Sequence, residues 1–183
     1  EDRRVTWKEY ELIEPSPKTS YRREITWSVF NEKANRFANL LLQRGIKKGD
    51  KVAILMMNGL EWLPIYFGVL KTGALAVPLN FRYSSDEIEY CVNLAEADVL
   101  VFSNPFIGRV EEIADRISKG RLLIYVGEGC PGFADDYTSL SANCSSQSPA
   151  IPLFEDDDAA IYFSSGTTGF PKAILHKHKS LTH

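Results

Sequence analysis

The sequence predicts an α/β protein whose βαβ units form a mainly parallel sheet flanked by helices. Apolar runs of strand length alternate with amphipathic segments of roughly 10–15 residues. Gly, Pro or helix-capping residues separate these segments. Such alternation is typical of parallel strands joined by right-handed helical crossovers. With 183 residues, 44% of them hydrophobic, the chain is long enough for one domain with a buried core, or for one domain and part of another.

The first predicted elements follow an irregular N-terminal extension, residues 1–25. Thr26 is a good N-cap, and apolar residues then recur at helical spacing until Gly45 stops the helix. Lys51–Met57 is almost continuously apolar, as expected of a strand that is covered on both faces. A second helix is predicted over Glu61–Thr72.

The same alternation continues to the end of this α/β subdomain, which we assign to residues 26–126. A strand is predicted over Ala74–Leu79. The sequence Ser84–Glu87 is a capping box, which opens a helix that runs to about Ala95. The remaining strand, helix and strand are predicted over Asp98–Phe102, Pro105–Lys119 and Arg121–Val126.

Residues 127–158 form a connecting region rich in Gly, Ser, Pro and Asp. Within it, only Asp136–Leu140 gives a weak indication of ordered structure. The region ends in the acidic run Glu155–Asp158. Two interpretations are open, a metal site and a solvated loop before a strand. We favour the loop, because three adjacent aspartates on an extended chain cannot all point at one ion.

Composition argues against several classes of protein. The net charge of −3 gives no reason to expect a nucleic acid or an anionic membrane as partner. The most apolar stretch, Trp62–Phe81, contains a lysine and two prolines, so we expect a buried helix and strand and no membrane span. The widely spaced Cys91, Cys130 and Cys144 suggest neither a disulfide framework nor a zinc site. With no apolar signal-peptide core near residue 1, these features favour a cytoplasmic protein.

Residues 159–183 carry the predicted chemistry. The β-like run Ala159–Phe163 precedes the segment SSGTTGFPK, residues 164–172. The residues after it look like a second strand and not a helix, so we expect a hairpin that leads to the start of a helix. Glycines let the backbone approach a ligand closely. Amides, hydroxyls and the ammonium group of Lys172 add hydrogen-bond donors. This loop therefore suits a polyphosphate.

The nucleotide-binding P-loop is the obvious candidate for such a loop, but its pattern does not fit. Gly166 is followed by Gly169, where the P-loop requires a Gly-Lys pair five residues on. Lys172 is followed by Ala173, where Ser or Thr is required. An ordinary P-loop NTPase is therefore disfavoured.

The segment instead resembles the phosphate-binding signature of adenylate-forming enzymes, which include acyl- and aryl-CoA synthetases, luciferases and the adenylation domains of peptide synthetases. Their pattern is [YF]-T-S-G-T-T-G-x-P-K-G-V. Ser164 stands here for the first Thr and Ala173 for the last Gly. The central G-T-T-G-x-P-K arises by chance at on the order of 10⁻⁷ per start position. Upstream stretches such as Leu70–Asn80 agree with the CoA-synthetase branch.

The resemblance implies an N-terminal fragment of an AMP-forming acid–CoA ligase, folded as part of the large N-terminal domain of such enzymes. ATP, Mg²⁺ and coenzyme A would be its cofactors and co-substrates. Lys172 and Thr167 would be catalytic, and Thr168 would help to hold the metal. Arg82 matches a position near the CoA phosphates in some relatives, although we favour a surface ion pair, and His178 matches a family histidine to which we assign no role. The residues that would bind the phosphates are Ser164, Ser165, Gly166, Thr167, Thr168, Gly169 and Lys172.

The resemblance also implies that residues 1–183 correspond to about the first third of such an enzyme. The adenine-, ribose- and magnesium-binding motifs and the C-terminal domain would follow, so we expect this fragment to be inactive alone. Its partners would be a carboxylic acid, ATP, CoA and the remainder of its own polypeptide, and we expect the fragment to self-associate. The alternative is a stand-alone nucleotide- or phosphate-binding module without ligase activity.

Overall fold

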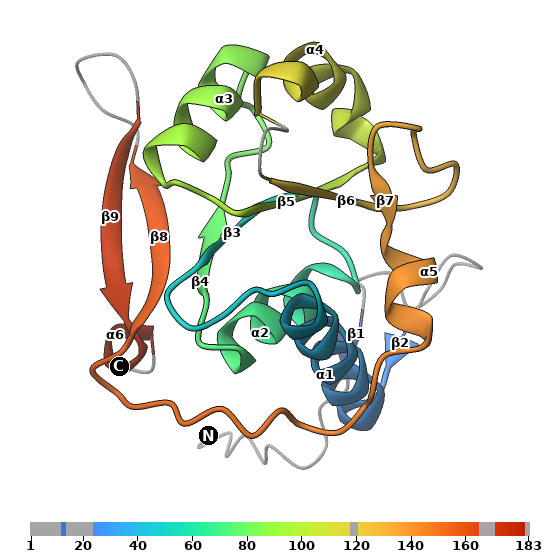
Figure 1. Ribbon diagram of the computed structural model, residues 1–183, viewed down its shortest axis with the longest axis vertical. Coiled ribbons are helices and arrows are strands. Elements are labelled where there is room, and N and C mark those ends of the chain that lie inside the picture. Colours follow the sequence, from blue (N-terminus) through green and yellow to red (C-terminus); the bar gives the residue numbers. More distant parts are fainter. Residues whose placement is uncertain (1–11, 14–23, 118–120, 165–170, 182–183) are drawn as a thin grey trace, which may run out of the picture.

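A seven-stranded sheet forms the centre of the molecule in the computed structural model, which describes residues 12–13, 24–117, 121–164 and 171–181 (Figure 1). The strand order is β7-β6-β5-β3-β4-β8-β9. Neighbouring strands are parallel except for the antiparallel pair β8–β9, which confirms the predicted mainly parallel sheet. The strands are β3 (Lys51–Leu55), β4 (Leu75–Pro78), β5 (Val99–Ser103), β6 (Leu122–Val126), β7 (Asp135–Asp136), β8 (Asp158–Ser164) and β9 (Lys172–Lys177).

Helices cover both faces of this sheet. α1 and α2 lie on one face with α5 beside them, and α3 and α4 lie on the other (Figure 1). The short helix α6 follows β9 directly. The helices are α1 (Trp27–Gln43), α2 (Trp62–Lys71), α3 (Ser85–Leu94), α4 (Ile107–Ile117), α5 (Tyr137–Ala142) and α6 (His178–Leu181).

The two predicted helix caps are present. The hydroxyl of Thr26 accepts a hydrogen bond from the Val29 amide at 3.3 Å and so begins α1. At α3 the capping box is complete: the Ser84 hydroxyl accepts from the Glu87 amide, and the Glu87 carboxylate accepts from the Ser84 amide at 2.8 Å. These bonds satisfy amides that have no partner within the first helical turn.

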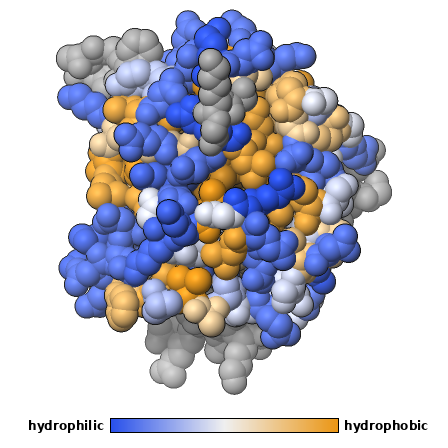
Figure 2. Space-filling model, viewed as in Figure 1, coloured by the Kyte–Doolittle hydropathy of each residue, from blue (hydrophilic) through white to orange (hydrophobic). Residues whose placement is uncertain are grey.

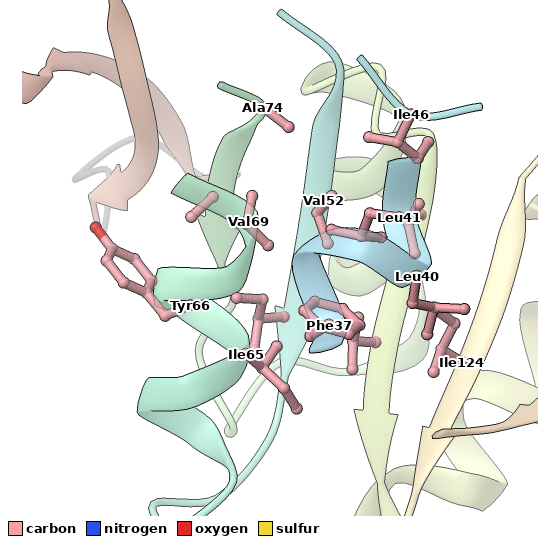
Figure 3. Close-up of a cluster of buried hydrophobic side chains, with 14 of the residues drawn as sticks. Phe37, Leu40, Leu41, Ile46, Val52, Ile65, Tyr66, Val69, Ala74 and Ile124 are labelled. Carbon is pink, nitrogen blue, oxygen red and sulfur yellow. The ribbon is translucent and has the colours of Figure 1, made fainter. Parts of the chain in front are cut away.

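Alternation along each central strand divides the core into two layers. Val52 and Ile54 of β3 face the α1–α2 layer, whereas Ala53 and Leu55 face α3 and α4. Successive side chains of a strand point to opposite faces, and both faces here are covered, so the whole strand is apolar. Figure 3 shows the α1–α2 layer, where Phe37 packs between the helices and the sheet.

Gly68 allows α1 and α2 to pack closely. A Cβ atom at this position would lie 2.9 Å from the backbone oxygen of Ala34 and 2.9 Å from the ring of Phe37. The neighbouring turn at Gly73 has a φ of +75°, a conformation that favours glycine. These two glycines fix α2 against α1 and turn the chain from α2 into β4.

α5 confirms the order expected at Asp136–Leu140, whereas β7, a 3₁₀ turn after β5 and a short strand pair in the N-terminal extension were not predicted. In the connecting region Asp136 caps α5, accepting from the Ser139 amide at 2.7 Å, and β7 adds an edge to the sheet beside β6. Asn104–Phe106 forms a 3₁₀ turn (η2), so α4 begins only at Ile107. In the N-terminal extension β1 (Leu12–Ile13) pairs with β2 (Glu24–Ile25). Two-residue strands are too short to produce a hydrophobic period, so the sequence carries no signal for them.

The apolar stretch Trp62–Phe81 forms α2 and β4, as predicted. Within the described residues, no helix has both the length and the apolar character needed to cross a bilayer.

Candidate phosphate-binding site

The predicted phosphate segment joins two antiparallel strands. Ser164, the last residue of β8, lies opposite Lys172, the first residue of β9. The pairing continues from Phe163 with Ala173 down to Asp158 with Lys177. This confirms that a strand, and not a helix, follows the segment, which distinguishes it from the P-loop arrangement.

The tip of this hairpin, residues 165–170, lies outside the described residues. Its proposed ligands, Ser165, Gly166, Thr167, Thr168 and Gly169, therefore stay predictions. The structure brings together the two flanking members of the set, Ser164 and Lys172.

Within the described part of the chain, Ser164 and Lys172 present unpaired polar groups on one face of the hairpin. Residues that lie directly opposite in an antiparallel pair present their side chains on the same face. Ser164 is half-buried and Lys172 is exposed. Among the described residues, the ammonium group of Lys172 has no carboxylate partner and the hydroxyl of Ser164 has no hydrogen-bond partner. The base of the hairpin thus offers one full positive charge and one hydroxyl donor.

Ser164 and Lys172 lie at the carboxyl edge of the sheet. β8 runs parallel to β4 and ends at Ser164, so its carboxyl end lies at the same edge as those of the parallel strands. Open α/β sheets bind ligands at this edge, outside the carboxyl ends of the strands. The place of the segment in the fold therefore suits a ligand.

A tyrosine pair connects the hairpin to helix α2. The hydroxyls of Tyr66 in α2 and Tyr162 in β8 are 2.7 Å apart. Burial, and then the hydrogen bond to Tyr162, raises the pKa of Tyr66, so the Tyr66 hydroxyl is neutral at physiological pH. Tyr66 is a buried core residue, and the sequence carries no signal for its hydrogen bond to Tyr162.

A groove of about 560 Å³ lies beside this tyrosine pair. The Nε2 atom of His178 is buried there and has no hydrogen-bond partner among the described residues. The groove is mostly apolar and contains the side chains of Trp62, Leu63, Tyr66, Phe67, Leu70, Lys71, Leu153, Tyr162, His178 and Leu181.

The acidic run forms ion pairs, in agreement with the loop interpretation. Asp157 accepts from the Lys48 ammonium at 2.5 Å, and Asp156 accepts from Lys179 at 2.5 Å. Asp158 lies 3.7 Å from the Lys177 ammonium. Within the described ranges, no three His, Cys, Asp or Glu side chains gather into a metal site.

Arg82 and Cys91 lie at some distance in the sequence from the hairpin. The exposed guanidinium of Arg82 lies 5.4 Å from the centroid of the Phe81 ring, and the described residues give it no carboxylate partner.

Burial, and then the charge of Glu87, raises the pKa of the Cys91 thiol to about 12. Cys91 is therefore a protonated core residue.

Comparison with known proteins identifies one family and several CoA ligases as similar to this chain. The family described as AMP-binding enzyme matches residues 10–183. The long-chain-fatty-acid–CoA ligase FadD13 of Mycobacterium tuberculosis is 33% identical over 170 residues, which are 92% of this chain and 32% of that protein. A crotonobetaine/carnitine–CoA ligase of Salmonella typhimurium is 35% identical over 165 residues, which are 87% of this chain and 32% of that ligase.

A solved structure shares the fold. The anthranilate CoA ligase AuaEII, solved in complex with anthranoyl-AMP, superposes with a TM-score of 0.82 at 30% identity. The match covers 86% of this chain and 30% of that ligase. The chain thus spans about a third of the length of the relatives it matches.

Proposed function

Because this chain belongs to the AMP-binding enzyme family, we propose that the protein containing it is an acid–CoA ligase that forms AMP. The enzyme would activate a carboxylate as acyl-AMP, release pyrophosphate and then form the CoA thioester. The observation that carries this proposal is the hairpin base, where Ser164 meets Lys172 at the carboxyl edge of the sheet. The ligase relatives support the same conclusion.

The hairpin would act on the phosphates of ATP. In the first step a carboxylate oxygen attacks the α-phosphorus, and the bond to pyrophosphate breaks. Two anions must meet and a polyanion must leave, so donors placed around the β- and γ-phosphates lower the barrier electrostatically. Lys172 and Thr167 would stabilise the leaving pyrophosphate. The full proposed set is Ser164, Ser165, Gly166, Thr167, Thr168, Gly169 and Lys172.

This chain would supply only part of the ligand set of a bound Mg²⁺ ion. Mg²⁺ prefers oxygen ligands and is often held by few protein groups together with substrate phosphates. The described residues offer no carboxylate cluster, so we assign one protein ligand, the hydroxyl of Thr168. When bound, the ion would neutralise phosphate charge.

The test is an assay of the longest reading frame that contains this chain. Pyrophosphate release from ATP is measured with a panel of short-chain, long-chain and aromatic acids. We expect release that depends on one class of acid, followed by thioester formation with CoA. Residues 1–183 alone should give none, because they span about a third of the relatives. Nucleotide binding by the complete protein without acid-dependent release would favour the stand-alone binding module instead.

A further inference from the structure

The β8–β9 hairpin is joined to the rest of the sheet by little backbone pairing. β8 and β9 pair with each other along their whole length, from Asp158 to Ser164. Between β8 and β4, in contrast, the register contains the single pair Ala76–Ala160. Backbone hydrogen bonds therefore hold the hairpin together as a unit but constrain its orientation weakly, so side chains must set its position on the sheet.

Tyr66 provides a rigid attachment point on α2. Its side chain is only 8% exposed, and its ring stacks on that of Trp62 with 5.4 Å between centroids. Figure 3 shows Tyr66 at the edge of the α1–α2 layer, with its hydroxyl directed away from the layer and toward the β8–β9 hairpin. The hydroxyl of Tyr162 meets it at 2.7 Å.

Tyr162 contacts both strands of the hairpin. It belongs to β8, and its ring packs edge-on against His176 of β9, with 5.1 Å between centroids. It precedes Ser164 by two residues, so both side chains lie on the same face of the sheet. Lys172 shares that face because it lies opposite Ser164. A displacement of Tyr162 would therefore move the two flanking phosphate ligands.

We propose that the hydrogen bond between Tyr66 and Tyr162 is a positioning link that fixes the phosphate hairpin relative to helix α2. The inference rests on the proposed function, since it gives these tyrosines a role in presenting Ser164 and Lys172 to phosphate. Neither tyrosine contacts the phosphate. The donors must be held in place before the ligand arrives, because small displacements weaken several hydrogen bonds at once.

The test compares Tyr66→Phe, Tyr162→Phe and the double variant of the 183-residue chain. Each substitution removes one hydroxyl and keeps the ring, including the contact of residue 162 with His176. Binding of inorganic tripolyphosphate is measured by NMR titration, and amide hydrogen exchange is followed in Ile161–Ser164 and in Lys172–His176. Tyr125→Phe is the matched control, because it removes a buried hydroxyl that donates to the Glu128 carbonyl at 2.8 Å, far from the hairpin in the fold.

Each single variant should bind tripolyphosphate about 3- to 10-fold more weakly, a range that corresponds to the loss of one hydrogen bond. Each should also exchange hairpin amides faster, with the amides of β5 and β6 unchanged. The double variant should be no worse than either single variant, because both changes break the same bond. The Tyr125→Phe control should keep wild-type affinity.

Three results would overturn the positioning link: wild-type affinity and exchange in the variants, additive losses in the double variant, or an equal loss in Tyr125→Phe. A wild-type chain that does not bind tripolyphosphate would instead count against phosphate binding by this hairpin. Hydrogen exchange would then still decide whether the tyrosines hold the hairpin, so the two failures can be distinguished.

Discussion

At the scale of single residues, two positions carry most of the chemistry and packing described above. Lys172 stands at the base of the hairpin, exposed and without a carboxylate partner among the described residues. Gly68 stands where α1 and α2 come too close for any side chain. Lys172 was predicted from the phosphate motif. The close helix packing at Gly68 was not, because a glycine within a helix does not by itself indicate a close contact.

Thr167→Val should lower the rate of acyl-adenylate formation in the full-length enzyme by about 10²-fold, while the fold stays intact. Valine keeps the shape of threonine but removes the hydroxyl that we place on the leaving phosphates. The measurement is acid-dependent pyrophosphate release. Thr138→Val, at an exposed position of α5, is the matched control and should leave the rate unchanged. An unaltered rate in Thr167→Val would remove this residue from the site.

Gly68→Ala should lower the free energy of unfolding by about 1–3 kcal/mol. Alanine is the better helix former, but its Cβ would lie 2.9 Å from the Ala34 backbone oxygen, and a backbone atom cannot move aside cheaply. Gly108→Ala in α4 is the control, because nothing lies within 4 Å of a Cβ there. It should instead stabilise the protein by up to about 1 kcal/mol. Urea denaturation of both variants checks the opposite signs.

At the scale of elements, most long segments were predicted correctly and most short ones were missed. α1 and α3 begin at their predicted caps, since a cap is a local signal that a hydroxyl and a nearby amide create between them. β7 and the η2 turn were not predicted. β7 forms by pairing with β6, which lies beside it only in the folded chain.

The ion pair between Lys48, which precedes β3, and Asp157, which precedes β8, should make stability depend on pH. The hydrogen bond from Lys48, and then that from the Phe154 amide, holds the pKa of Asp157 below its ordinary value of 3.8. A group whose pKa is lowered by folding stabilises the protein above its unfolded pKa, and this contribution is lost as the pH falls through the folded pKa.

Asp157→Asn should therefore unfold at a lower temperature than the wild type at pH 7, and the difference should shrink below about pH 4. Thermal unfolding recorded across this pH range is the measurement. Asp115→Asn, at an exposed position of α4, serves as the control and should follow the wild-type curve. A difference that is the same at pH 7 and at pH 3 would show that the ion pair with Lys48 does not contribute.

At the scale of the whole molecule, strand β9 exposes apolar side chains beside the candidate site. Ile174 and Leu175 of β9 are 47% and 55% exposed, and because they are adjacent they face opposite sides of the sheet. Figure 2 shows hydrophobic surface on the left of the molecule, where Figure 1 places β8 and β9. Among the described strands, β9 has a neighbour on one side only.

We expect the 183-residue chain to self-associate through this strand, since an edge strand with apolar faces pairs readily with another chain. Leu175→Lys should shift the equilibrium toward monomer, which sedimentation over a range of concentrations measures. Leu94→Lys is the control, because Leu94 is also exposed, at 48%, but lies at the end of α3. A wild-type chain that stays monomeric at all concentrations would contradict this expectation.

The α/β class and the phosphate motif could be read from the linear order of residues, because hydrophobic period, helix caps and the GTTG-x-PK spacing are properties of neighbours along the chain. The strand order and the bond between Tyr66 and Tyr162 could not. The two tyrosines are 96 residues apart in the sequence. They meet only after the sheet has formed and has brought α2 beside β8. Interactions between neighbours along the chain thus specified the helices, the strands and the phosphate motif. Tertiary packing decided which of these elements lie together at the hairpin.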